Sequence, residues 1–179
     1  MSNIVVDSLV KKFGTLTAVD GISFAVEPGE VFGFLGPNGA GKSTTINILC
    51  TLLAPTSGQA FVGGFDCVRE PDDVRRSIGI IFQDPTLDNG LTAYENLLFH
   101  AYLYGLDRIT AKKRIEDVLA LVDLTPRKDE LVRKFSGGMK RRLEIARGLM
   151  NYPKVLFMDE PTLGLDPQTR NMIWEFIGS

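Results

Sequence analysis

The stretch Gly36-Pro37-Asn38-Gly39-Ala40-Gly41-Lys42-Ser43-Thr44 decides the fold that we expect for this chain of 179 residues. It fits the pattern G-x-x-x-x-G-K-[S/T], whose successive backbone N–H groups wrap a chain of phosphates. The three glycines leave the backbone open to close approach and permit positive φ. Lys42 can reach the β- and γ-phosphates, and the Ser43 hydroxyl can hold Mg²⁺.

The flanking residues support this interpretation. Residues 31–35 are a short apolar run suited to a buried strand, and residues 43–53 carry apolar side chains at helical spacing. The order strand, glycine loop, helix directs a partly positive helix N-terminus at the phosphates. A chance glycine-rich turn is the alternative, and the flanking elements favour nucleotide binding over it.

The composition excludes several classes of protein. The chain is 44% hydrophobic and 23% charged with a net charge of −2, which indicates one globular domain without a nucleic-acid footprint. Two cysteines make no disulfide or metal framework, and the N-terminus lacks a secretion signal. No run reaches the ~18 apolar residues of a membrane span. We therefore expect a cytoplasmic protein that reaches a membrane only through a partner.

Hydrophobic spacing and turn residues predict the other elements. We expect strands at residues 4–10, 21–26, 59–62 and 77–82, and helices at residues 71–76, 92–105, 110–122 and 139–150. Thr92 and Glu95 form a capping-box pair at one helix start. The basic run at residues 112–114 indicates a solvated face. His100, alone among apolar residues, is interpreted as packed or half-exposed rather than catalytic.

Phe13 has two interpretations. It is either a core residue at a strand end or an exposed flat face for a purine ring, where stacking contributes about 1–3 kcal/mol per base. On its own the core interpretation is favoured.

Two further stretches carry chemistry. In Phe135-Ser136-Gly137-Gly138-Met139-Lys140, Ser136 is a good N-cap and the glycines expose backbone donors to an anion; an ordinary loop–helix junction is the alternative. The following helix carries Lys140, Arg141, Arg142 and Arg147, either as a solvated face or as a partner contact. The apolar run Val155–Met158 ends in Asp159 and Glu160, where an Asp helps hold Mg²⁺ in P-loop NTPases. Glu160 could take a proton from attacking water, an action that contributes about 10²–10⁴-fold.

Taken together, these motifs resemble the nucleotide-binding subunits of ATP-binding cassette (ABC) transporters over essentially the whole chain. Residues 36–44 resemble the Walker A loop, residues 135–139 the signature and residues 155–160 Walker B. Gln83 matches the Q-loop glutamine and Gly164-Leu165-Asp166 the D-loop. The sequence of residues 135–143 is similar to that of drug-resistance exporters of the daunorubicin-like, ABC-2 type.

The resemblance implies an α/β fold of the P-loop NTPase class: an ABC-type ATPase core with an antiparallel β subdomain and an inserted helical subdomain. Residues 1–179 would form one incomplete nucleotide-binding domain, with the core at 1–83 and 151–179. Residues 84–150 would form the helical subdomain.

The resemblance also implies the role of each site residue. Lys42 and the backbone N–H groups of the loop would bind the phosphates of ATP, and Phe13 would stack on adenine. Ser43, Gln83 and Asp159 would hold Mg²⁺. Glu160 would be the general base, with Gln83 and Lys42 also catalytic. Ser136, Gly137 and Gly138 would contact ATP held by a second copy, which makes a head-to-tail homodimer. Gln83 would also sense a membrane-spanning transporter subunit.

The sequence departs from the family pattern in two places. Met139 stands where the family usually has Gln, and the chain ends at Ser179 before the family's switch histidine. We expect a truncated domain that binds ATP while hydrolysis is weak or absent. The alternatives to an exporter ATPase are a soluble ABC ATPase without a transporter and a nucleotide-gated interaction module without turnover.

Overall fold

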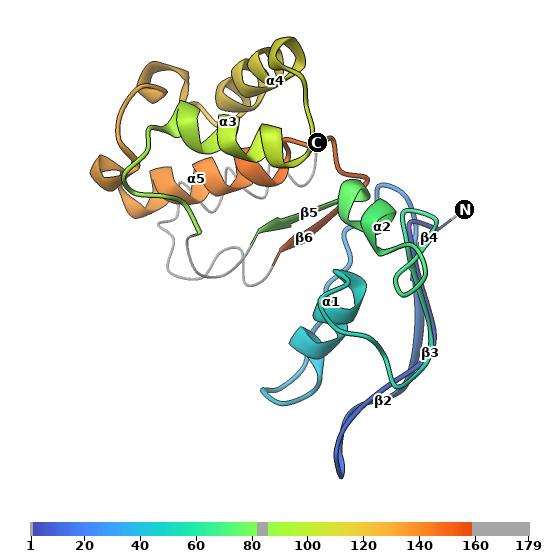
Figure 1. Ribbon diagram of the computed structural model, residues 1–179. Coiled ribbons are helices and arrows are strands. Elements are labelled where there is room, and N and C mark those ends of the chain that lie inside the picture. The colour runs from blue at the N-terminus through green and yellow to red at the C-terminus, as the bar shows by residue number, and fades with distance from the viewer. Residues whose placement is uncertain (1, 82–85, 159–179) are drawn as a thin grey trace. The chain divides into compact units, whose positions relative to one another are not determined.

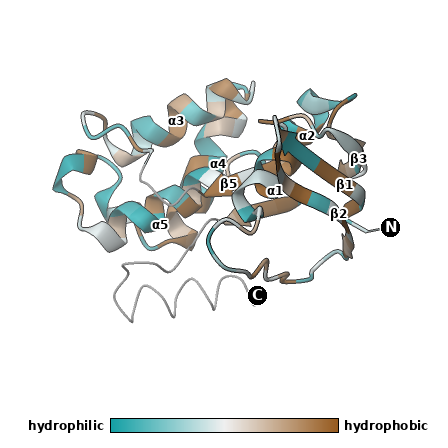
Figure 2. Ribbon diagram, turned by 90° about the horizontal axis from the view of Figure 1, so that it is seen from below, coloured by the Kyte–Doolittle hydropathy of each residue, from teal (hydrophilic) through white to brown (hydrophobic). Residues whose placement is uncertain are grey.

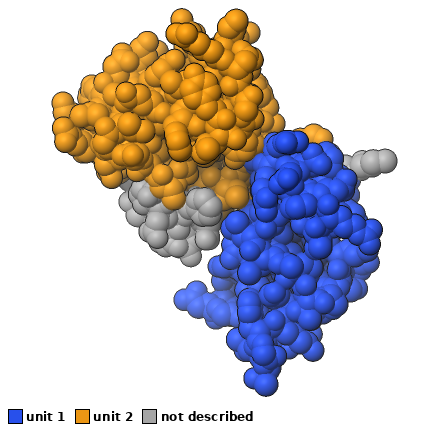
Figure 3. All heavy atoms as spheres, in the orientation of Figure 1, with its two compact units in different colours: residues 1–78 blue, residues 79–179 orange. Residues whose placement is uncertain are grey.

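The computed structural model describes residues 2–81 and 86–158 and divides into two compact units, residues 1–78 and 79–179 (Figure 3). The predicted site residues Gln83, Asp159 and Glu160 lie outside the described residues, as does the predicted D-loop stretch at 164–166. None of the helices in the described ranges is long and apolar enough to cross a membrane.

Unit 1 is built on an antiparallel sheet with the strand order β2-β1-β3-β4 (Figure 1). The strands are β1 (Ile4–Phe13), β2 (Leu16–Val26), β3 (Ser57–Val62) and β4 (Phe65–Asp66). Alternation along β1 buries Ile4 and Val6, which is the period-2 pattern of a half-buried strand, and the register shift between Val6 and Leu9 returns Leu9 to the buried face. The sheet confirms the predicted β subdomain.

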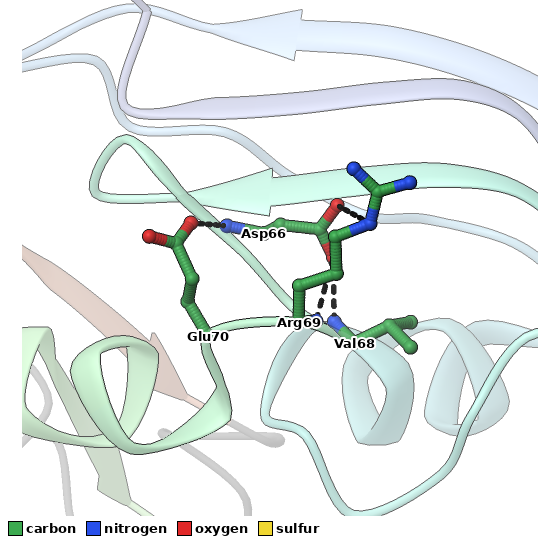
Figure 4. Close-up of polar contacts among 4 residues, drawn as sticks. All are labelled: Asp66, Val68, Arg69 and Glu70. Carbon is green, nitrogen blue, oxygen red and sulfur yellow. Dashed lines mark hydrogen bonds and ion pairs between the residues drawn. The ribbon is translucent and has the colours of Figure 1, made fainter.

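Two helices belong to unit 1, α1 (Lys42–Leu49) and α2 (Pro71–Ser77). The connection from β4 to α2 is closed by side-chain acceptors (Figure 4). The Asp66 carboxylate accepts from the N–H groups of Val68 and Arg69 at 2.8 and 3.0 Å, and the Glu70 carboxylate accepts from Asp66 N–H at 2.9 Å. Pro71 then opens α2, as predicted, because its missing N–H costs nothing at a helix start.

Unit 2 packs α3 (Ala93–Leu103), α4 (Arg108–Leu121) and α5 (Gly137–Gly148) against one another. It also carries β6 (Val155–Met158), which pairs with β5 (Ile78–Ile81), a strand whose first residue is the last of unit 1. Short 3₁₀ turns lie at Thr125–Arg127 and Val132–Lys134. The ribbons of α3 and α5 alternate between hydrophilic and hydrophobic segments, as amphipathic helices do (Figure 2). The apolar faces of α3, α4 and α5 meet in one core that includes Leu97, Ile115, Leu119 and Leu143.

Strand β5 and helix α5 approach so closely that glycine is required where they touch. A Cβ added at Gly79 would lie 2.1 Å from the carbonyl oxygen of Gly148 and 2.8 Å from a methyl of Leu156. Any other residue at position 79 would force the strand and the helix apart.

The predicted buried strand at residues 31–35 is wrong in this structure. The segment has no regular structure, and Val31 and Leu35 are 62% and 94% exposed. A strand needs a partner for its N–H and C=O groups, and no described strand pairs with this one. Its aromatic side chains instead pack beside β2, where Phe32 stacks on Phe24 with 5.2 Å between ring centroids.

Other boundaries and faces also differ from prediction. Helix α1 ends at Leu49 rather than at residue 53, because Thr51 adopts a positive φ of 62°. On α3, Leu97 and Ala101 are buried, whereas Tyr102 and Leu103, which belong to the same run of apolar residues, are exposed. The predicted solvated run at 112–114 is wrong for Arg114, whose guanidinium lies 3.7 Å from the ring centroid of Tyr152.

Candidate nucleotide-binding site

The glycine loop leads directly into α1, as the sequence predicts. Gly39 and Gly41 adopt φ of 85° and 82°, the left-handed region that favours glycine, and Gly41 is the N-cap of α1. A Cβ added at Gly41 would lie 2.2 Å from the carbonyl oxygen of Ala18 in β2. Position 41 therefore requires glycine for two reasons, its backbone conformation and its contact with the sheet.

The Lys42 ammonium is folded onto the loop that precedes it. Its Nζ donates to the carbonyl oxygens of Gly36 at 2.6 Å and Pro37 at 2.9 Å. Thr45, which is buried, donates through Oγ1 to the Gly41 carbonyl at 3.0 Å and so braces the first turn of α1. The positive charge is thereby held within the curve of the loop.

This arrangement suits an anion. The first N–H groups of a helix lack intrahelical partners and carry the positive end of the helix dipole, and Lys42 adds a full charge beside them. The side chain of Ser43 is exposed at the same helix start. One protein hydroxyl suits Mg²⁺, which takes its other ligands from phosphate oxygens and water.

The described residues provide no preformed metal cage. Within 2–81 and 86–158, no group of three His, Cys, Asp or Glu side chains could hold an ion.

Phe13 lies at the hairpin between β1 and β2, opposite Leu16. Its side chain is 47% exposed, and Lys11 Nζ lies 5.0 Å from its ring centroid. The core interpretation of Phe13 is therefore wrong, and an open aromatic face is present. Stacking of adenine on that face stays a prediction.

The predicted signature stretch forms the start of α5 in unit 2. Ser136 is the N-cap, and its Oγ accepts from Met139 N–H at 3.3 Å, as predicted. Helix α5 begins at Gly137, two residues earlier than expected, and Ser136 and Gly137 are exposed. Buried Phe135 anchors the turn, and the exposed Ser136 and Gly137 leave this helix start open to solvent.

The solvated-face interpretation of the basic residues of α5 is wrong for Arg141 and Arg147, which are buried, while Lys140 and Arg142 are half-buried and their contact with a partner stays a prediction. Arg141 pairs with Glu144 at 3.1 Å, and both side chains are buried. Arg147 donates to the Thr86 carbonyl, Arg142 to the Val122 carbonyl and Lys140 to Asn89 Oδ1, at 3.1, 3.3 and 2.8 Å. One residue could have indicated from the sequence that these basic side chains have buried partners. Glu144 is a single carboxylate between the apolar residues Leu143 and Ile145.

His100 is half-buried on α3, as predicted, with its ring edge-on to Tyr104 at 5.2 Å between centroids. Burial and the charge of Arg147 lower the pKa of His100 to about 4, so the ring is neutral at neutral pH. Its place in the helix packing is structural.

Comparison with known proteins identifies the family. The family described as "ABC transporter" matches residues 19–163. The linearmycin resistance ATP-binding protein LnrL of Bacillus subtilis is 48% identical over 171 residues, which cover 96% of this chain and 55% of that protein. The daunorubicin/doxorubicin resistance ATP-binding protein DrrA of Streptomyces peucetius is 46% identical over 169 residues, which cover 94% of this chain and 51% of that protein.

A solved structure supports the same conclusion for the fold. CbiO1 of Clostridium perfringens, part of the ABC transporter complex cbiONQ, superposes with a TM-score of 0.89 at 33% identity over 99% of this chain and 72% of its own. The predicted fold class is confirmed. The chain spans about half the length of the curated relatives it matches. With its glycine loop and these likenesses, the chain belongs to the ABC transporter family.

Proposed function

We propose that this chain belongs to a subunit that binds and hydrolyses ATP to power a membrane exporter. The observation that carries the proposal is the loop at 36–44, with two glycines at positive φ, the Lys42 ammonium held inside it and a helix N-terminus behind it. Residues 1–83 and 151–179 form the ATP-binding core in this proposal, and residues 84–150 form the helical subdomain.

Each residue of the candidate site has a role that suits its side chain. Lys42 and the loop N–H groups bind and orient the phosphates, and Phe13 presents its open face to the adenine ring. Mg²⁺, held through Ser43, Gln83 and Asp159, supplies neutralisation of charge on the phosphate oxygens. Glu160 accepts a proton from the attacking water. The roles of Gln83, Asp159 and Glu160 rest on the family resemblance, since these residues lie outside the described ranges.

A second copy of the chain completes the site in this proposal. Ser136, Gly137 and Gly138 contact the γ-phosphate of ATP bound to the other copy, so that ATP closes a head-to-tail dimer. The exposure of Ser136 and Gly137 at the start of α5 supports this role. A membrane-spanning subunit then holds the dimer at the cytoplasmic face of the membrane, without nucleic acid.

The cargo class follows from the relatives' names. LnrL is named for linearmycin resistance and DrrA for resistance to daunorubicin and doxorubicin. We therefore assign drugs or other small hydrophobic compounds as the exported class.

Glu160→Gln tests the proposed enzyme against a nucleotide-gated module. The variant keeps the size of the side chain and loses its basicity, so ATP turnover should fall at least ~100-fold while binding of Mg-ATP is unchanged. Phosphate release and binding of a fluorescent ATP analogue measure the two properties. Equal turnover in the variant and the parent would contradict the proposal.

A further inference from the structure

The backbone of one residue, Thr86, is held on both of its polar groups by α5. The N–H of Thr86 donates to Glu144 Oε1 at 2.8 Å, and the carbonyl of Thr86 accepts from Arg147 Nη1 at 3.1 Å. Glu144 and Arg147 stand one turn apart on the same helix face, so a single helix face grips both polar groups of one residue.

The carboxylate of Glu144 is buried, and each of its two oxygens accepts a hydrogen bond. Glu144 is 1% exposed, and its second oxygen, Oε2, accepts from Arg141 Nη1 at 3.1 Å. Removing a carboxylate from water is costly, and a buried ion pair often stabilises a fold no better than apolar side chains would. Stability alone is therefore a weak reason for a carboxylate at this position, whereas a fixed grip on Thr86 needs one.

The segment around Thr86 is fixed by single hydrogen bonds, some from side chains and some from the backbone of Val132 and Arg133. Residues 86–91 belong to no helix or strand, so no backbone ladder fixes them. They are tied instead by Asn96, which accepts from Asp88 N–H at 2.9 Å, by Lys140 on Asn89, and by Val132 N–H on the Leu91 carbonyl at 2.9 Å. Two of these anchors, Lys140 and Val132, flank the Ser136 turn in the chain.

We propose that Glu144 is a positioning residue that locks residues 86–91 to the signature helix α5, so that a displacement of either one moves the other during the ATP cycle. The proposal rests on the proposed function for the meaning of that movement, because the Ser136 turn is where α5 would meet ATP. The lock itself is a property of unit 2 and is present without nucleotide.

Amide hydrogen exchange of the nucleotide-free chain tests the lock. A glutamine at 144 keeps the side-chain volume but has one carbonyl oxygen in place of two carboxylate oxygens, and the buried charged guanidinium of Arg141 is the stronger donor for it. The NH₂ group of the glutamine then faces the Thr86 N–H, which loses its acceptor. In Glu144→Gln the Thr86 amide should exchange about tenfold faster than in the parent. Glu130→Gln is the matched control, because Glu130 makes the same i,i+3 pair with Arg127 at 3.1 Å on an exposed surface. It should leave the exchange of Thr86 unchanged.

Steady-state turnover tests the positioning. Glu144→Gln should lower kcat for ATP about tenfold while KM stays within about twofold, since Lys42 and its loop are untouched. A merely structural role would lower the active fraction, which appears as a reduced melting temperature and reduced binding stoichiometry. If Glu144→Gln fails to fold, Arg141→Met/Glu144→Leu removes both members of the buried ion pair and should fold, and because it leaves Thr86 N–H without an acceptor it should show fast exchange at Thr86 and low kcat.

The outcomes separate the two proposals. A parent chain that neither binds nor turns over Mg-ATP contradicts the proposed function, and the exchange of Thr86 then still decides the lock. Parent-like exchange at Thr86 in a folded Glu144→Gln variant overturns the lock. Fast exchange with parent-like kcat overturns the positioning role.

Discussion

At the scale of single residues, Gly41 carries the most specific constraint in the loop. Gly41→Ala would require a left-handed backbone from alanine and would press its Cβ against the Ala18 carbonyl. We expect a loss of about 3 kcal/mol in the free energy of unfolding, measured by urea denaturation. Gly39→Ala is the control: its φ is also positive, but nothing lies within 4 Å, so the loss should be only about 1 kcal/mol. Equal losses would show that the contact with Ala18 is unimportant.

His100 makes the stability of unit 2 depend on pH. Its pKa is about 4 in the folded chain against an ordinary 6.5, so the unfolded state binds more protons between these values. The stabilisation is full above pH 6.5 and is lost as the pH falls towards 4. After allowance for the partial exposure of the ring, we expect a loss of about 1–2 kcal/mol between pH 7 and 4.5. Urea titrations at both pH values should show this loss reduced in His100→Gln, and an identical loss in that variant would refute the assignment.

At the scale of elements, local sequence predicted the helices well because their ends are encoded by neighbouring residues. The Thr92 hydroxyl accepts from Glu95 N–H at 3.1 Å, and the Glu95 carboxylate accepts from Thr92 N–H at 2.7 Å, which is the predicted capping box. The same local argument fails for residues 31–35. Their apolar run signals burial, but a strand also needs a partner, and partners are set by residues far away in the chain.

Thr92→Ala tests the capping box at the start of α3. Loss of the hydroxyl leaves the Glu95 N–H without its acceptor, so unfolding should become easier by about 1 kcal/mol. Thermal unfolding measures this, and Glu95→Gln is the control, since glutamine also serves at that position of a capping box. Thr92→Ala should cost more stability than Glu95→Gln does; the reverse order would contradict the cap assignment.

At the scale of the whole molecule, the parts of the candidate site that consist of consecutive residues could be predicted from the sequence. The loop at 36–44 and the Ser136 helix start have the conformations that their sequences indicate. The buried partners of α5 were not predictable, because Glu144 meets Thr86 from 58 residues away. Four basic side chains on one helix indicate a solvated surface until the tertiary neighbours of each are known.

The account as a whole depends on Lys42 gripping phosphate inside the glycine loop, and Lys42→Ala tests this most directly. Titration of the parent, of Lys42→Ala and of the exposed control Lys113→Ala with a fluorescent ATP analogue and Mg²⁺ gives three affinities. We predict an affinity at least ~10-fold weaker for Lys42→Ala and a parent-like affinity for Lys113→Ala, because only Lys42 lies in the loop. Binding by Lys42→Ala as tight as by the parent would contradict the account.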